Sequence, residues 1–210
     1  MSDKTALNRL PERGVTDRET INAILDAGFV CHAAYVVEDR PVVLPTLYAR
    51  DGDSVLLHGS NTMGLARAVR NGSPLSVAVT HIDGLVVARS AFHSSANYRS
   101  VVIHGRGEIV SGKQHAHALD VIIETLIPGR TADIRANTES ELKQTSVIRL
   151  SLDEVSAKIR SGDPSDELED MNSGVWAGVV PMTLQAGEPI RASDLEEDVD
   201  TPDYLNPYRR

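Results

Sequence analysis

A segment of the chain at residues 45–62 carries groups suited to binding an anionic ligand. A predicted strand ends near Arg50, and after a turn a second strand leads into Gly59 and Ser60, directly before a predicted helix that starts near Thr62. Gly59 permits close approach of the backbone, and the first turn of a helix offers unpaired amides to a phosphate. Arg50 would add positive charge. The spacing suits a phosphate site, and it equally suits a hairpin followed by an ordinary helix cap.

Other catalytic patterns are missing from the sequence. The closest pair of its seven histidines, His115 and His117, would project from different sides of a helix, and no nearby acidic residue completes a zinc motif. Neither a Gly-x-Ser-x-Gly nucleophile elbow nor a Gly-x-Gly-x-x-Gly loop at a strand end occurs. The single cysteine, Cys31, lies in a mostly apolar run and is interpreted as a buried, unreactive thiol. The residues therefore predict no metal site, no serine hydrolase and no Rossmann dinucleotide fold.

The elements that position these residues are mostly strands. The segment Thr16 to Glu19 has the spacing of a capping box and predicts a helix that ends at Gly28. Beyond it, short alternating runs are separated by turn residues, which is typical of an antiparallel barrel with added helices. Strands are predicted at 29–37, 42–49, 54–59, 75–80, 85–91, 98–110, 145–152, 155–159 and 175–180, and further helices at 62–69, 113–127 and 139–144.

The charge distribution argues against nucleic acid as a partner. The chain has 210 residues and a net charge of −9, and 12 of its 30 acidic residues lie in 163–210. That acidic end would repel a phosphate backbone, and its composition predicts a solvated, mobile tail. The longest apolar runs are too short to cross a bilayer, and the first residues lead into no apolar signal segment. We therefore expect a cytoplasmic protein that binds neither nucleic acid nor a membrane.

Several separated motifs occur in an order that resembles a known family. They are the strand 45–50, Leu57-His58-Gly59-Ser60, the run from Tyr98 to Gly105, Ser156-Ala157-Lys158-Ile159-Arg160 and Val175-Trp176-Ala177-Gly178. In this order they resemble the pyridoxamine 5′-phosphate oxidase-like superfamily, and in particular its branch of nitroimidazole-resistance proteins. The resemblance implies a mainly β fold with helices (α+β), a six-stranded antiparallel split β-barrel that binds FMN. It implies a barrel domain at 29–182, preceded by a helical segment at 1–28 and followed by the acidic tail at 183–210.

The same resemblance implies a homodimer with one FMN at each of two subunit interfaces. Trp176 would cover the flavin ring from the partner chain or pack in the core, and Lys158 with Arg160 would bind an anion or form surface ion pairs. The residues implied to contact the cofactor are Thr46, Leu47, Arg50, His58, Gly59, Ser60, Thr62, Arg99, Ser100, Lys158 and Trp176.

Two departures from the family pattern separate this chain from vitamin B6 oxidases. Asn61-Thr62-Met63-Gly64 occupies the place where those enzymes have a Ser-Arg-Lys-type clamp on the flavin phosphate. No arginine–histidine signature follows Trp176. The resemblance therefore extends to the fold and the flavin but not to the substrate of those oxidases.

We expect an FMN-dependent oxidoreductase that acts on a small organic molecule, such as a nitroaromatic or pyridoxamine-like substrate, with the flavin supplying the chemistry. A flavin or ligand carrier without turnover is the first alternative. Haem binding or degradation is the second, with His58, His81, His93 or His104 as the axial ligand. Deazaflavin is a further cofactor that related barrels are expected to accept.

Overall fold

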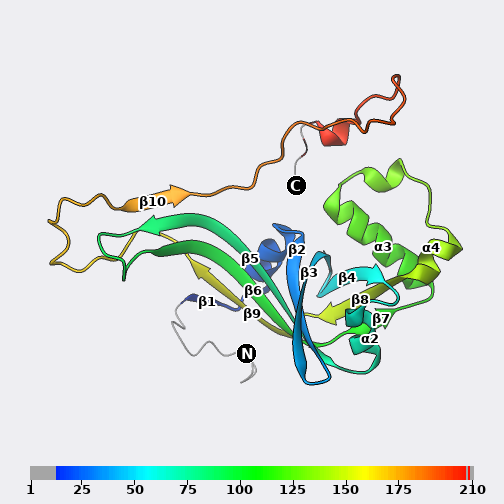
Figure 1. Ribbon diagram of the computed structural model, residues 1–210, viewed down its shortest axis with the longest axis horizontal. Coiled ribbons are helices and arrows are strands. Elements are labelled where there is room, and N and C mark those ends of the chain that lie inside the picture. The colour runs from blue at the N-terminus through cyan, green and yellow to red at the C-terminus, as the bar shows by residue number, and fades with distance from the viewer. Residues whose placement is uncertain (1–12, 207, 209–210) are drawn as a thin grey trace.

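The computed structural model describes residues 13–206 and 208, and within them ten strands form one hydrogen-bonded sheet (Figure 1). Every strand pair is antiparallel, as predicted. The strand order is β1-β9-β6-β5-β2-β3-β4-β8-β7, with β10 paired to β5. The strands are β1 (Gly14–Val15), β2 (Val30–Val37), β3 (Arg40–Asp51), β4 (Ser54–Ser60), β5 (Pro74–Val87), β6 (Ser95–Arg106), β7 (Glu108–Val110), β8 (Thr145–Ser151), β9 (Glu154–Arg160) and β10 (Gly178–Pro181).

The predicted fold class is confirmed, and the sheet has more strands than the expected six because short strands β1, β7 and β10 add to it. The α-helices are α1 (Arg18–Asp26), α2 (Gly64–Arg70), α3 (Lys113–Leu126) and α4 (Glu139–Gln144), and short 3-10 helices lie at Arg130–Ala132 and Asp203–Leu205. None of the described helices has the length and apolar content needed to cross a membrane.

The barrel encloses the larger of two apolar cores, because alternate residues of each strand point inward. Cys31 is fully buried there, which confirms the sequence interpretation, and burial raises the pKa of its thiol to about 12. Helix α1 closes one end of the barrel through Ile21, Ile24 and Leu25, which belong to the same core. Residues 13–28 are thus part of the barrel, while residues 1–12 of the expected N-terminal segment lie outside the described residues.

A second apolar core lies between helix α3 and the outer face of strands β3, β4 and β8. Ala49 and Leu56 from the sheet meet Ala118 and Ile122 from the helix. Their spacing of four residues puts Ala118 and Ile122 on one side of α3, as the helical periodicity of 113–127 predicts. This packing holds α3 over the sheet and leaves a cavity beside it.

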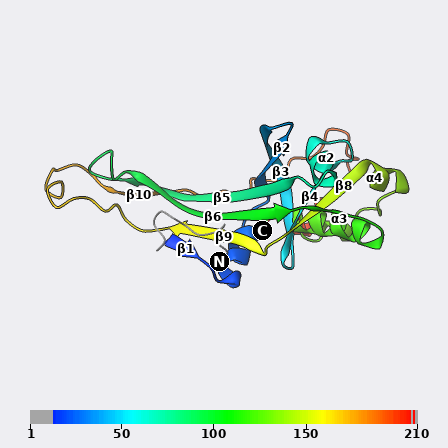
Figure 2. The ribbon, with the colours of Figure 1, turned by 90° about the horizontal axis from the view of Figure 1, so that it is seen from below.

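Strands β5 and β6 extend together beyond the barrel as a long arm, and β10 pairs alongside β5 in its outer part (Figures 1 and 2). The strands predicted at 75–80 and 85–91 are one strand, β5, because an irregularity between Ile82 and Gly84 lets the pairing with β6 continue. Gly84 is required there, since a Cβ at this position would lie 2.9 Å from Val179 Cγ1 and 3.0 Å from the Val180 carbonyl oxygen. The residues between the two predicted strands therefore form a bulge within one strand and not a turn that reverses the chain.

One helix start differs from the prediction. Asp17, not Thr16, is the N-cap of α1, and its carboxylate accepts a hydrogen bond of 2.8 Å from the Thr20 amide. The helix consequently begins one residue later than a Thr16 cap requires. A capping box is instead formed at α4, between Thr138 and Glu141.

The tail leaves β10 and runs back in extended form toward α3 (Figure 1). Its far end is anchored there, because the Tyr204 hydroxyl contacts Arg130 at 3.0 Å and donates to the Asp133 carboxylate at 2.6 Å. The Tyr208 hydroxyl donates to the Leu126 carbonyl. Aromatic residues thus attach an otherwise exposed acidic segment to the body of the protein.

The β2–β3 hairpin contains two non-glycine residues with positive φ, Glu38 at 47° and Asp39 at 62°. They form the two-residue loop between the paired residues Val37 and Arg40, where such turns favour Asn-Gly or Asp-Gly. We predict that Asp39→Gly raises the free energy of unfolding by about 0.5–1 kcal/mol in urea titration, because it removes left-handed strain.

The matched control for this prediction is Gly52→Ala, which makes the opposite exchange at a φ of +57° where no atom lies within 4 Å of an added Cβ. It should lower the free energy of unfolding by about 1 kcal/mol. A destabilised Asp39→Gly variant would show that contacts of the Asp39 side chain outweigh the backbone strain.

Candidate functional site

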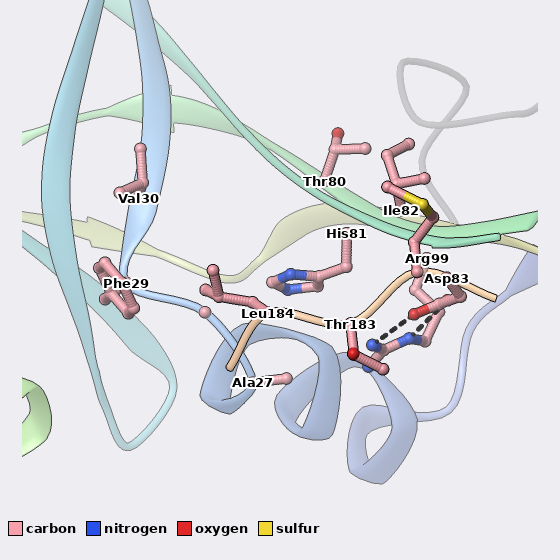
Figure 3. Close-up of a pocket in the computed structure, with 12 residues that line it drawn as sticks. Ala27, Phe29, Val30, Thr80, His81, Ile82, Asp83, Arg99, Thr183 and Leu184 are labelled. Atoms are coloured by element: carbon pink, nitrogen blue, oxygen red, sulfur yellow. Dashed lines mark hydrogen bonds and ion pairs between the residues drawn. The ribbon is translucent and has the colours of Figure 1, made fainter. Parts of the chain in front are cut away.

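A first cavity, called here the tail-covered cavity, lies between the end of α1, strands β5 and β6, and the segment that follows β10 (Figure 3). Its volume is about 470 Å³. The Met182 amide donates to the Asp83 carbonyl at 3.0 Å, which holds the tail over this cavity. The cavity is lined by Ala27, Gly28, Phe29, Val30, Thr80, His81, Ile82, Asp83, Arg99, Met182, Thr183 and Leu184.

The charged groups of the tail-covered cavity are Asp83 and Arg99, on neighbouring strands (Figure 3). Two hydrogen bonds of 2.9 and 2.8 Å join the guanidinium to the carboxylate. They lower the pKa of Asp83 and raise the pKa of Arg99, so both groups stay charged at neutral pH. Both side chains are more than one third exposed, which leaves the pair open to exchange with an anionic ligand.

His81 is held in a fixed orientation against α1. Its Nε2 donates to the Ile24 carbonyl at 3.0 Å, since a carbonyl can only accept. Its Cε1 lies only 2.4 Å from the position of a Cβ on Gly28. Glycine at position 28 therefore allows the histidine to pack against the chain where α1 leads into β2.

A second cavity, called here the helix-covered cavity, lies beside α3 and has a volume of about 460 Å³. Leu119, Ile122 and Ile123 of α3 form an apolar side, and Ile134 adds to it. Polar groups complete the lining, which consists of His58, Leu119, Asp120, Ile122, Ile123, Thr131, Ile134, Arg135, Ala136, Asn137 and Thr145.

His58 lines the helix-covered cavity from β4. It follows Leu56 by two residues, so its side chain is on the face that α3 covers. Its Nδ1 is buried without a hydrogen-bond partner. Burial lowers the pKa of the ring, which keeps it neutral at physiological pH.

The two cavities are connected by one row of residues across the sheet. Val30 in the tail-covered cavity pairs with Leu47 on β3. Leu47 precedes Tyr48, which pairs with Leu57, so Leu47 lies beside His58 of the helix-covered cavity. Neighbouring strands are about 4.8 Å apart, which places Val30 and His58 roughly 10 Å from each other.

The structure brings together part of the predicted phosphate segment. Ser60 and Thr62 are joined by a 3.0 Å contact between their hydroxyl oxygens, and a Cβ on Gly59 would lie 2.4 Å from the Met63 sulfur. Thr46, by contrast, pairs with the buried Cys31 and lies on the opposite face from Leu47. Their side chains therefore cannot contact the same ligand from one face.

Arg50 does not reach the Gly59–Ser60 segment, so the suggested contribution of its charge there is wrong. It pairs with Val55, which is five residues from Ser60 and thus about 17 Å away along the strand. Its guanidinium instead binds both carboxylate oxygens of Asp26 at 2.7 and 2.6 Å.

The cation at this strand-to-helix junction is Arg70, which the sequence analysis did not select. It donates to the Asn61 carbonyl at 2.8 Å, to the Asn61 side chain, and to the Ser146 hydroxyl at 2.8 Å. Arg70 lies in the last turn of the short helix α2, which packs back on the end of a strand. This position in the predicted helix could have identified it.

The remaining predicted residues lie on the arm side of the molecule. Ser100 pairs with Thr80 on one side and Lys158 on the other, forming a polar row on the face of the sheet opposite to His81 and Arg99. Arg99 lines that cavity. Trp176 is 64% exposed, which contradicts packing in the core, and its ring lies against Gly178 just before β10. Arg160 donates to the Asn97 side chain.

Comparison with known proteins identifies the family of this fold. A family model described as pyridoxamine 5′-phosphate oxidase matches residues 17–159. The chain belongs to this family. Among curated proteins, none matches the chain. The matched residues cover the barrel and end before the tail segment 182–184 that lines the tail-covered cavity.

Two solved structures resemble the chain over nearly its whole length. One is the FAD and heme binding protein from Mycobacterium smegmatis, 38% identical, with a TM-score of 0.90 over 93% of this chain and 96% of that one. The other is the flavocytochrome Anf3 from Azotobacter vinelandii, 36% identical, with a TM-score of 0.94 over 99% and 97%. Both likenesses include the tail as well as the barrel.

A third solved structure, named for 5-nitroimidazole antibiotic resistance, comes from Bacteroides thetaiotaomicron. It is 18% identical, with a TM-score of 0.59 over 70% of this chain and 86% of that one. At this identity the likeness shows the shared split-barrel fold alone.

The close approach of Gly28 and His81 generates a testable prediction. Gly28→Ala should lower the free energy of unfolding by about 1–3 kcal/mol in urea titration, because the new methyl group displaces His81 from its contact with Ile24.

Gly187→Ala is the control for this change, since no atom lies within 4 Å of its Cβ position, and it should be neutral within about 0.5 kcal/mol. In the double variant Gly28→Ala/His81→Ala, the loss of unfolding free energy should be smaller than the sum of the losses in the two single variants. If the two losses are fully additive, the loss of stability in Gly28→Ala does not arise from the displacement of His81.

Proposed function

We propose that this protein binds a flavin and a haem and transfers electrons between them, as a flavocytochrome. The observation that carries the proposal is the likeness, at 36–38% identity and over more than nine-tenths of the chain, to two proteins whose names state these groups. The tail-covered cavity and the helix-covered cavity offer a separate place for each group.

For the flavin we assign the tail-covered cavity. Phe29 and Leu184 offer apolar contacts to a flat ring system. Arg99 offers a guanidinium to phosphate on the face of the sheet that carries His81. The Thr80–Ser100–Lys158 row lies on the opposite face.

The chemistry comes from the bound groups, since a flavin exchanges two electrons and a haem iron exchanges one. The protein supplies position: the row Val30–Leu47–His58 separates the cavities by about 10 Å, and the tail shields one of them. Small nitroaromatic or pyridoxamine-like molecules remain the candidate electron acceptors. A carrier that binds the groups without turnover is the competing function.

The third prediction concerns the cofactors of the purified protein. We expect flavin absorbance together with a haem Soret band, and chromatography of the released flavin to identify FAD, with FMN and deazaflavin as the other resolved outcomes. Anaerobic reduction of the flavin should be followed by reduction of the haem iron in the same spectrum. Flavin without haem after reconstitution would contradict the flavocytochrome proposal, and bound groups that never exchange electrons would favour the carrier.

We also propose that the protein is a homodimer. Exposed apolar side chains gather on the outer face of β2 and β3, where Val43 is 62% exposed, and along the arm at Ile82 and Leu85. Small residues such as Ala34 and Ala78 on the same face permit the close approach of another sheet. A second copy of the chain would bury this face and receive the arm.

The fourth prediction tests the dimer by light scattering after size-exclusion chromatography. The wild-type protein should have twice the mass of the chain, and Val43→Asp should shift it toward the monomer because a charge is buried without a partner. Ile190→Asp, at a tail position that is 96% exposed, is the matched control and should remain dimeric. A wild-type monomer at micromolar concentration would refute the assignment.

A further inference from the structure

We propose that Nε2 of His58 is the axial ligand of the haem iron, and that the haem lies in the helix-covered cavity. The inference rests on the proposed function, which requires a haem but leaves its place in the fold open. It assigns a ligand and a cavity to that group.

The position of His58 in the sheet directs its ring toward this cavity. Alternation along β4 places Leu56 and His58 on the face beneath α3, whereas Leu57 points into the barrel core. His58 also lies opposite Val147, which belongs to the core under α3. The ring therefore emerges from a rigid strand at the edge of a packed apolar core, a setting that fixes its direction.

The two ring nitrogens of His58 have different surroundings. Nδ1 is buried and has no hydrogen-bond partner, so Nε2 is the nitrogen that the cavity can reach. Burial lowers the pKa of the ring, and a neutral imidazole has a lone pair to give to a metal. Nε2 is also the nitrogen farther from the backbone, so a flat macrocycle can approach it without meeting the main chain.

The walls of the helix-covered cavity have the chemistry that a haem requires. Leu119, Ile122, Ile123 and Ile134 provide apolar surface for the macrocycle. Arg135 lies on the exposed side, where its guanidinium binds Glu141 at 2.6 and 2.9 Å. Both members of this pair are largely exposed, so a carboxylate of the ligand can take the place of Glu141.

The other histidines suggested by the sequence lie outside the helix-covered cavity. His81 uses Nε2 to bind the Ile24 carbonyl, and His104 uses Nδ1 to contact the Ser76 hydroxyl at 2.8 Å. His93 stacks edge-on with Phe92 and faces Glu167 at 3.4 Å. Of these four, His58 alone combines a buried Nδ1 without a partner and a place in the helix-covered cavity.

The lack of an acceptor at Nδ1 has a spectroscopic consequence. Metal-bound histidines usually donate this N–H to a carboxylate or a carbonyl, which increases the basicity of the ligand. Without such a partner, His58 should be a weakly donating ligand. We therefore expect the iron–histidine stretch of the ferrous protein, measured by resonance Raman, at a lower frequency than in haem proteins whose proximal histidine is bonded to a carboxylate.

The test is reconstitution of the full-length His58→Ala variant with haemin, read out by the Soret band and by haem retention on a desalting column. Haem affinity should fall at least tenfold, and the Soret band of the remaining complex should shift. Added imidazole should restore the wild-type spectrum by occupying the space of the missing ring. His58→Gln, which keeps most of the volume, serves as a second variant if the alanine variant does not fold.

Two controls separate ligation from general damage. His117→Ala removes an exposed histidine of α3 outside the cavity and should leave the spectrum unchanged. His81→Ala removes the histidine of the tail-covered cavity and should disturb flavin content but not the Soret band.

The outcomes distinguish this inference from the proposed function. Wild-type protein that takes up no haem would defeat both. Wild-type haem uptake with an unaltered Soret band in both His58 variants would overturn the His58 assignment alone. Loss of the Soret band in His81→Ala with retention in His58→Ala would move the haem to the tail-covered cavity.

Discussion

The attachment of the last turn of α1 to the barrel is the constraint on which the sites depend. The final carbonyl groups of a helix have no partners within it. Here the Tyr48 hydroxyl donates to the Leu25 carbonyl at 2.5 Å, and His81 donates to the Ile24 carbonyl at 3.0 Å. These bonds join α1 to β3 and β5, set the start of β2, and so form the wall of the tail-covered cavity around Gly28.

Strand β3 transmits this geometry to the second cavity. It is long enough to pair with β2 along one part and with β4 along another, and Leu47 lies at the junction of the two. A rigid sheet therefore determines the separation of the two cavities, which suits the proposed electron transfer better than a connection through loops. The segment Asn61–Gly64 has no phosphate clamp of the kind expected in vitamin B6 oxidases. The arginine at this place, Arg70, is bound to Asn61 and Ser146.

The tail has a structural role that its acidic composition does not predict. Residues 182–184 close one cavity, and Tyr204 attaches the far end to the loop beside the other. Its apolar side chain Leu184 is 89% exposed in the single chain. Such exposure is expected where a second subunit provides the covering surface.

The sequence by itself determined the antiparallel barrel, the α3 helix and the buried Cys31, because these follow from local periodicity and from the transfer of apolar side chains out of water. Through the order of motifs it also predicted His58, Arg99, Ser100 and Lys158 as cofactor contacts, and the structure places His58 and Arg99 at two cavities. Only the tertiary structure decided that Arg50 binds Asp26, that Arg70 occupies the strand-to-helix junction, and that Val30, Leu47 and His58 form one row. Pairing register and ion-pair partners join residues that are distant in the chain, so no local pattern encodes them.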